Sequence, residues 1–214
     1  ARVAQKESGG ITQHISSYQT TVDTPNGPRE ITFIDTPGHA AFCAMRTRGA
    51  GITDLVVLVI SAVDGVMAQT KECISQIKKS NLPVIVAMTK IDLDTKNPEM
   101  VKGQLVEMDL TPEEYGGQTT VIPISSKTGE GIDTLLENIL LNADIMELKN
   151  EPDAPLQAMI IESKLDKNRG PLAAIIIQKG TLRLGDQIFA ENIGGKVKAL
   201  INSDGKPISE AGPS

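Results

Sequence analysis

The sequence is poor in aromatic residues. Its 214 residues include no Trp, two Tyr and three Phe, whereas hydrophobic residues as a group make up 40%. A core for a chain of this length must therefore be built mainly from aliphatic side chains. Long apolar runs are missing as well: the longest, residues 55–60, is far too short to cross a membrane, so we expect no membrane partner.

Cysteine and positive charge are also scarce. Cys43 and Cys73 are the only two cysteines, and they form neither a metal-binding spacing nor a disulfide framework, so we expect reduced core thiols. The 21 Lys and Arg are outnumbered by 27 Asp and Glu, which gives a net charge of −6. This balance argues against a bare nucleic-acid-binding module, and any nucleic-acid surface must be local.

Short apolar runs alternate with helical patterns in the first two thirds of the chain. This alternation predicts an α/β fold with a parallel sheet and right-handed crossovers. Strands of such a sheet are covered by helices, so residues 54–60 and 83–88 are expected to be buried on both faces. The runs expected as strands are residues 32–34, 54–60, 83–88 and 119–124, and the segments expected as helices are residues 69–79 and 132–143.

The pattern changes near residues 149–155, whose Pro and acidic residues are typical of a linker. Beyond it the apolar runs are short, rich in β-branched residues and separated by glycines. We therefore predict two domains, residues 1–149 and 150–214, the second a small β-barrel or sandwich. Its expected strands are residues 158–163, 172–178, 187–190 and 196–201.

Polar residues follow three of the expected strands. In open α/β sheets, ligands bind beyond the carboxyl ends of the strands. One Asp-x-x-Gly sequence is an ordinary turn, but three polar segments in order at successive strand ends favour a nucleotide site. The segments are Asp35 to Gly38, then Thr89, Lys90 and Asp92, and finally Ser125, Ser126 and Lys127.

Each segment suits one part of a nucleotide. Asp35 can hold Mg²⁺ through water, and Gly38 lets a backbone N–H approach a terminal phosphate. Asp92 can accept hydrogen bonds from two adjacent N–H groups on one base edge, which guanine presents and adenine does not. The stem of Lys90 can lie along the base plane, and a backbone N–H in residues 125–127 can reach the guanine oxygen.

These segments, together with GGITQHI at residues 9–15 and the run at residues 31–42, resemble the bacterial-type translation initiation factor 2 family of translational GTPases. Elongation factors share Asp-x-Pro-Gly-His but differ at residues 9–15. The resemblance covers most of residues 1–149, and residues 150–214 are similar to the start of that family's second domain. It implies a partial P-loop GTPase-type G-domain followed by a partial β-barrel.

The resemblance also implies roles for single residues. Thr12 corresponds to the switch I threonine that meets Mg²⁺ and the γ-phosphate, and Asp35 and Gly38 open switch II. His39 corresponds to the residue that orients the attacking water. His14 does not follow the Pro-Gly turn, so we interpret it as a surface or switch-loop residue.

The resemblance further implies an activity and partners. The implied activity is hydrolysis of GTP to GDP and phosphate, with Mg²⁺. The implied partners are both ribosomal subunits and, through domains beyond residue 214, initiator formyl-methionyl-tRNA. The implied location is the bacterial cytoplasm, with the mitochondrial matrix as the alternative.

The chain departs from the family pattern at two places. Thr89 stands where the family usually has Asn, which predicts weaker nucleotide binding with guanine selectivity retained through Asp92. No Gly-x-x-x-x-Gly-Lys-Ser/Thr occurs in the 214 residues. In the family this phosphate loop lies just upstream, with a strand that separates the strands equivalent to residues 30–35 and 54–60. We therefore expect this chain alone to bind GTP weakly, to be inactive, and to have an unstable or rearranged first domain.

Two other interpretations stay open. One is a non-catalytic ribosome- or tRNA-binding module with a degenerate G-domain. The other is a different translational GTPase, such as an elongation or selenocysteine-delivery factor, against which residues 9–15 argue.

Overall fold

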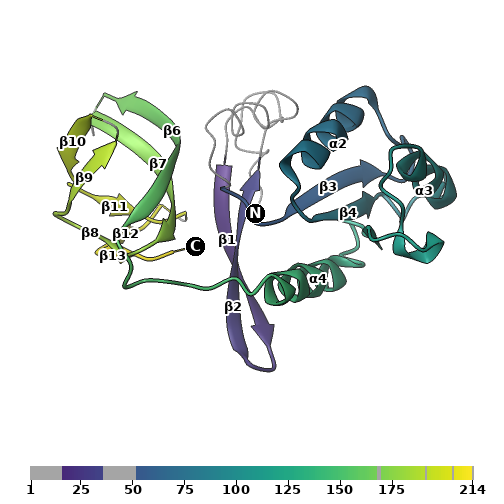
Figure 1. The fold of residues 1–214 in the computed structure, drawn as a ribbon, viewed down its shortest axis with the longest axis horizontal. Coiled ribbons are helices and arrows are strands. Elements are labelled where there is room, and N and C mark those ends of the chain that lie inside the picture. Colours follow the sequence, from purple (N-terminus) through teal and green to yellow (C-terminus); the bar gives the residue numbers. More distant parts are fainter. Residues whose placement is uncertain (1–15, 36–51, 168–169, 191, 204, 214) are drawn as a thin grey trace. The chain divides into compact units, whose positions relative to one another are not determined.

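The computed structural model describes residues 16–35, 52–167, 170–190, 192–203 and 205–213. Figure 1 shows a hairpin near the start of the chain, an α/β unit and a β-rich unit. The predicted residues Thr12, Gly38 and His39 lie outside the described residues.

The hairpin consists of β1 (Ser16–Thr24) and β2 (Gly27–Asp35), which pair antiparallel along their whole length. The expected strand at residues 32–34 is thus confirmed as the end of a longer one, whereas β1 was not predicted. Within the described residues, β2 pairs with β1 and not with β3 (Val56–Ser61), the next strand along the chain.

The hairpin turns over Pro25 and Asn26. Thr24 faces Gly27 in the strand register, and the Thr24 hydroxyl donates a hydrogen bond of 2.6 Å to the carbonyl oxygen of Gly27. Gly27 has a φ of 109°, a region that favours glycine. The turn is therefore fixed by local chemistry: Pro25 restricts the backbone at the first turn position, and Gly27 permits the positive φ that follows the turn.

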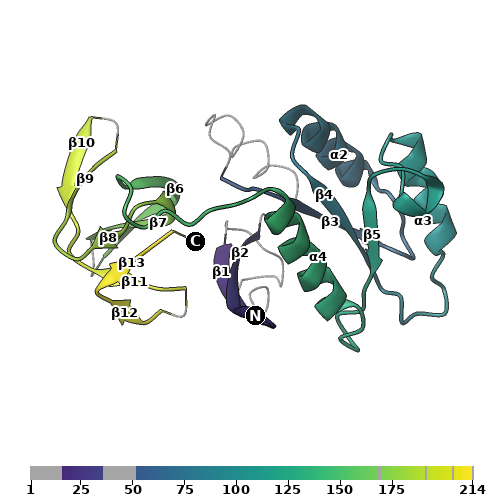
Figure 2. The ribbon, with the colours of Figure 1, turned by 60° about the horizontal axis from the view of Figure 1, so that its bottom comes forward.

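The α/β unit is built on a parallel sheet in the order β3-β4-β5, which Figure 2 shows. The two further strands are β4 (Val84–Thr89) and β5 (Thr120–Pro123), and both pairings are parallel, as predicted. Ser61 lies opposite Thr89, and Met88 lies opposite Pro123. This register brings the carboxyl ends of all three strands to the same edge.

Among the described residues, three α-helices accompany this sheet. The two helices expected from apolar spacing are confirmed as α2 (Ala68–Ser80) and α4 (Ile132–Ile145), and Figure 1 shows them on opposite sides of β3 and β4. A third, α3 (Pro98–Glu107), was not predicted. It begins where Asn97 accepts a hydrogen bond of 3.1 Å from the N–H of Met100, which caps the helix.

The main core lies where α2 and α3 pack against β3 and β4. It is entirely aliphatic apart from Met and Cys side chains, as the scarcity of aromatic residues predicts. Fully buried members include Ile60, Ile74, Val86, Val101 and Leu105.

The prediction of burial on both faces holds for β4 but is wrong for β3. Residues 85–88 of β4 are all buried, whereas Val59 of β3 is 60% exposed. The physical reason is position: β4 is the central strand, and β3 is an edge strand of the described sheet. The core cluster includes Leu58 and Ile60, on the face of β3 opposite to Val59.

Residues 150–214 are β-rich, as predicted, and their described strands form two-stranded sheets. A small core of Ile177, Leu182 and Val197 lies among them. The pairs are β6 (Gln157–Asp166) with β7 (Gly170–Lys179), β8 (Leu182–Arg183) with β13 (Glu210–Ala211), β9 (Gln187–Ala190) with β10 (Ile193–Lys196), and β11 (Leu200–Ile201) with β12 (Pro207–Ile208).

The prediction of one strand over residues 196–201 is wrong, because these residues are divided between β10 and β11. The interruption is Val197, which is 9% exposed and turns into the small core. Its N–H donates to the carbonyl of Asp186, and its own carbonyl accepts from the N–H of Gly185, both at 2.9 Å. These backbone bonds tie Val197 to the turn before β9. Because they join separate parts of the chain, the pattern of apolar residues does not predict the break between the two strands.

Leu105→Ala tests the core of the α/β unit. Leu105 is fully buried, and we expect the substitution to lower the free energy of unfolding by about 2–5 kcal/mol. The neighbouring Val106→Ala is the control, because Val106 is 40% exposed and its loss should cost about 0.5 kcal/mol or less. Urea unfolding followed by helical circular dichroism reports on this unit, because α2, α3 and α4 all lie in it. Equal effects of the two substitutions would contradict the packing.

Candidate functional site

The carboxyl ends of β3, β4 and β5 are joined by direct hydrogen bonds. The Thr89 hydroxyl donates to the carbonyl of Ile60 at 3.3 Å, and the carbonyl of Thr89 accepts from the N–H of Ala62 at 2.8 Å. On the other side of β4, the N–H of Ile124 donates to the carbonyl of Met88 at 2.8 Å. The loops that leave the three strands therefore start from a common, fixed edge.

Ser125 and Asp92, predicted to lie in one site, are in direct contact. The Ser125 side chain is fully buried, and its hydroxyl donates to Oδ1 of Asp92 at 2.8 Å. The same hydroxyl oxygen accepts from the N–H groups of Lys127 at 3.3 Å and Thr128 at 3.2 Å. One side chain thus organises its own loop and orients the aspartate of the neighbouring loop.

This contact also keeps Asp92 ionised. The hydrogen bond from Ser125 holds the pKa of Asp92 below the ordinary aspartate value of 3.8, assisted by a backbone N–H and by the charges of Lys127 and Lys96. An ionised carboxylate only accepts hydrogen bonds, so near neutral pH Asp92 is suited to a ligand edge made of donors.

Lys90 is held by a residue that the sequence interpretation missed. Its Nζ lies 2.6 Å from Oδ2 of Asp64, and both side chains are about half exposed, at 50% and 49%. The hydrogen bond from Lys90 lowers the pKa of Asp64. The signal that could have revealed Asp64 is the Asp-Gly pair just after β3, a fourth polar segment at a strand end.

The backbone of Lys90 is unusual. Its φ is 62°, in the left-handed region that non-glycine residues rarely occupy. Ser126 and Lys127 are exposed in the loop after β5, next to the contact between Ser125 and Asp92. The structure therefore places six predicted residues at the same edge of the sheet. They are Thr89 at the end of β4, Lys90 and Asp92 in the loop after it, and Ser125, Ser126 and Lys127 in the loop after β5.

Asp35, the predicted metal-side aspartate, is the last residue of β2 and is partly buried. Burial, and secondarily the charge of Asp35, raise the pKa of Tyr18, whose ring stacks on Phe33 with ring centroids 5.3 Å apart.

In the part of the chain that the structure describes, no three His, Cys, Asp or Glu side chains gather as a metal site. None of the described helices is long and apolar enough to cross a membrane.

Comparison with known protein families agrees with this arrangement. The sequence model of the elongation factor Tu GTP binding domain matches residues 2–144. The chain belongs to this family. The model of elongation factor G domain 2 matches residues 155–214. The expected fold class, a GTPase G-domain followed by a β-rich domain, is confirmed.

A comparison with an individual relative shows which kind of translation factor the chain resembles. The chain is 53% identical over 214 residues to translation initiation factor IF-2 of Aliarcobacter butzleri, which confirms the resemblance to initiation factor 2. The alignment covers 100% of this chain and 24% of that protein, so the chain spans about a quarter of the length of this curated relative.

Solved structures of translation factors have the same fold. GDP-bound aIF5B from Aeropyrum pernix aligns with a TM-score of 0.66 and 25% identity, over 86% of this chain and 39% of that one. The apo form of elongation factor SelB from Methanococcus maripaludis aligns with a TM-score of 0.67 and 26% identity, over 91% of this chain and 43% of that one. Both are structures of translation factors, in agreement with the family assignment.

Ser125→Ala tests the contact with Asp92. Because the hydroxyl lowers the pKa of Asp92, its removal should raise that pKa toward 3.8, measured by NMR titration of the side-chain carboxyl carbon. The stabilisation that the contact provides is present above the ordinary aspartate pKa and is lost as the pH falls through the lowered value.

Ser126→Ala is the matched control, because Ser126 is the exposed neighbour. It should leave the Asp92 titration unchanged. A wild-type titration curve in Ser125→Ala would show that another group holds Asp92.

Proposed function

We propose that this chain is the guanine-binding segment of a translation initiation GTPase, which promotes initiator tRNA placement and subunit joining. The observation that carries the proposal is the contact of 2.8 Å between Ser125 and Asp92 at the carboxyl edge of a parallel sheet. It is supported by the 53% identity to IF-2 over the whole chain. The GDP that aIF5B holds in its solved structure is the kind of ligand expected here.

The base is recognised by the two loops after β4 and β5. Asp92, kept ionised and oriented by Ser125, accepts from the two adjacent N–H groups of guanine. The stem of Lys90 lies along the base, and a backbone N–H near Ser126 or Lys127 binds the guanine oxygen. Thr89 supplies one hydroxyl, which already donates to Ile60, so we expect weaker binding than an asparagine would give.

For the phosphates, the assignment of residues rests on the family resemblance. Thr12 and Asp35 would hold Mg²⁺, Gly38 would offer its N–H to the γ-phosphate, and His39 would orient the attacking water. Asp35 fits such a site because it is a carboxylate at the carboxyl end of a strand. When bound, Mg²⁺ neutralises charge on the β- and γ-phosphates.

The partners follow from the same assignment. The factor acts on both ribosomal subunits in the bacterial cytoplasm, or in the mitochondrial matrix if the source is an organelle. Domains beyond residue 214 bind initiator formyl-methionyl-tRNA. The identity of 53% to IF-2 over the whole chain supports initiation over selenocysteine delivery. The hydrogen bond from Ser125, which orients the Asp92 carboxylate, supports a working base site over a degenerate scaffold.

Asp92→Asn tests base recognition in the full-length protein that contains this chain. Asn presents one acceptor and one donor, which match the N1–H and the 2-oxo group of xanthine. We expect the affinity for GDP to fall about a hundredfold or more while the affinity for XDP rises. Competition binding with both nucleotides measures the change.

Asp94→Asn is the control for this experiment. Asp94 is exposed in the same loop, two residues away, and is outside the proposed site. It should leave both affinities unchanged. Retention of guanine preference in Asp92→Asn would remove the basis of the proposal.

His39→Ala tests the hydrolytic role. If His39 orients water without holding nucleotide, ribosome-stimulated GTP hydrolysis should fall about a hundredfold or more. The Kd for GTP should stay near the wild-type value. His14→Ala is the control, because we assign His14 no catalytic part, and its hydrolysis rate should stay near normal. Equal rate losses in the two variants would contradict the assignment to His39.

A further inference from the structure

The loop of residues 61–66, between β3 and α2, carries the aspartate that pairs with Lys90. The loop closes on itself: the N–H of Gly65 donates to the carbonyl of Ser61 at 2.9 Å, and the Ser61 hydroxyl accepts from the N–H of Asp64 at 3.1 Å. These bonds make the loop one compact turn. Whatever shifts Gly65 or Val66 therefore also shifts the Asp64 carboxylate.

The far end of this turn is held by a side chain from α3. Oε1 of Gln104 accepts a hydrogen bond of 2.7 Å from the N–H of Val66. It also lies against Gly65, where a Cβ would come within 2.6 Å of Oε1 and within 3.0 Å of the Met100 methyl carbon. With its φ of 71°, Gly65 is a position that only glycine suits, and Gln104 packs directly on it.

We propose that Gln104 is a positioning residue for the nucleotide-binding site, acting through the 61–66 turn on Asp64 and so on Lys90. The inference rests on the proposed function, because it assigns Lys90 to the guanine base. The contacts run without a gap: Gln104 to the N–H of Val66, the closed turn to Asp64, and Asp64 to Nζ of Lys90 at 2.6 Å.

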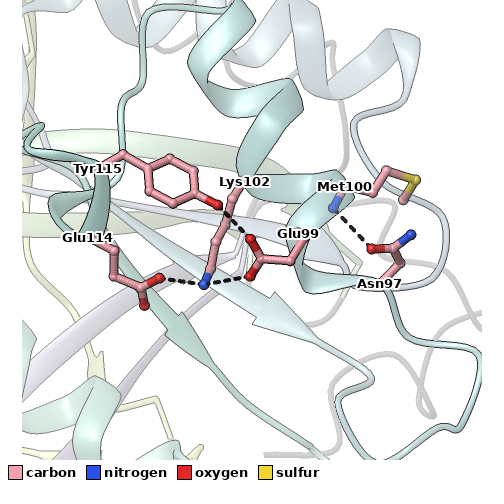
Figure 3. A network of polar contacts seen from close by, with 6 residues as sticks. All are labelled: Asn97, Glu99, Met100, Lys102, Glu114 and Tyr115. Carbon is pink, nitrogen blue, oxygen red and sulfur yellow. Dashed lines mark hydrogen bonds and ion pairs between the residues drawn. The ribbon is translucent and has the colours of Figure 1, made fainter.

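The helix that presents Gln104 is itself well fixed. At its start, the N–H of Asn97 donates to the carbonyl of Ala62 at 2.7 Å, so α3 holds the turn at both ends. On its outer face, shown in Figure 3, Lys102 pairs with Glu99 and Glu114. The hydroxyl of Tyr115 donates to Glu99 at 2.6 Å, which ties η2 (Glu113–Tyr115) to the same helix.

This arrangement accounts for how Lys90 can be held although it is half exposed. An exposed ion pair between mobile side chains is weak, because both side chains lose conformational freedom when they pair. Here the carboxylate partner sits on a turn that is hydrogen-bonded to β4 and to α3, so less freedom is lost on pairing. Because its ammonium group is fixed, the lysine stem is held in place for a base to lie on.

Gln104→Leu removes the acceptor and keeps the side-chain size. A hollow of about 230 Å³, lined by Val66, Lys71, Gln104, Glu107 and Met108, adjoins the side chain and can receive the leucine branch. In the full-length protein we expect the Kd for GDP to rise about tenfold, the effect of one lost hydrogen bond. Gln104→Glu retains an acceptor for the N–H of Val66 and should restore the Kd to within about twofold.

A second readout separates positioning from simple loss of structure. Once the turn is released, Asp64 loses its partner, so its pKa, measured by NMR, should rise toward 3.8 in Gln104→Leu and stay low in Gln104→Glu. In Gln104→Asn the side chain is shorter, so its carbonyl oxygen cannot reach the N–H of Val66, and this variant should behave like Gln104→Leu. Gln69→Leu is the control, because Gln69 is exposed on α2 and should change neither readout.

The results decide between the two proposals. If Asp92→Asn switches base preference while both Gln104→Leu and Gln104→Asn keep the wild-type Kd and Asp64 titration, the role of Gln104 is wrong and the proposed function stands. If Asp92→Asn leaves base preference unchanged, the proposed function fails and the nucleotide role of Gln104 fails with it, whatever the Asp64 titration shows.

Discussion

The hydroxyl of Ser125 lies where the loops after β4 and β5 meet, and it makes three hydrogen bonds there. It donates to Asp92 and accepts from the N–H groups of Lys127 and Thr128. Because the hydroxyl is fully buried, losing it would remove a hydrogen bond from Asp92 and from the N–H groups of Lys127 and Thr128 at once. The parallel register of β4 and β5 brings the two loops together, and this one oxygen turns their proximity into a defined geometry.

Much of the fold could be predicted because its signals are local. The apolar runs predicted β3, β4 and β5, and apolar spacing predicted α2 and α4. By contrast, α3 buries only Val101 and Leu105 and contains Gly103, so its apolar stripe is weak. Similarly, β1 consists mostly of Ser, Thr and other polar residues, and its pairing with β2 is what makes it a strand. Thus β1 depends on pairing across its own hairpin, and α3 depends on contacts with residues distant in the sequence.

The site divides in the same way. Asp92 and Ser125 were predictable, because each has a chemical reason to follow a strand end. Asp64 and Gln104 were not, because their importance comes from contacts across 26 and 38 residues of sequence. Burial of β3 was mispredicted for a related reason: an apolar strand reads the same at the edge of a sheet as at its centre. Sequence patterns identify groups that can bind, and tertiary contacts identify groups that hold them.

The left-handed backbone of Lys90 has a consequence for protein engineering. A lysine in a free peptide would leave this conformation, since glycine or asparagine suits it better. Residues 89–92 copied into another scaffold would therefore relax and point the lysine and aspartate elsewhere. A functional graft would have to include the 61–66 turn and the loop carrying Ser125, because these hold the two side chains from outside the motif. The smallest transferable unit is thus a set of three loops on a parallel sheet.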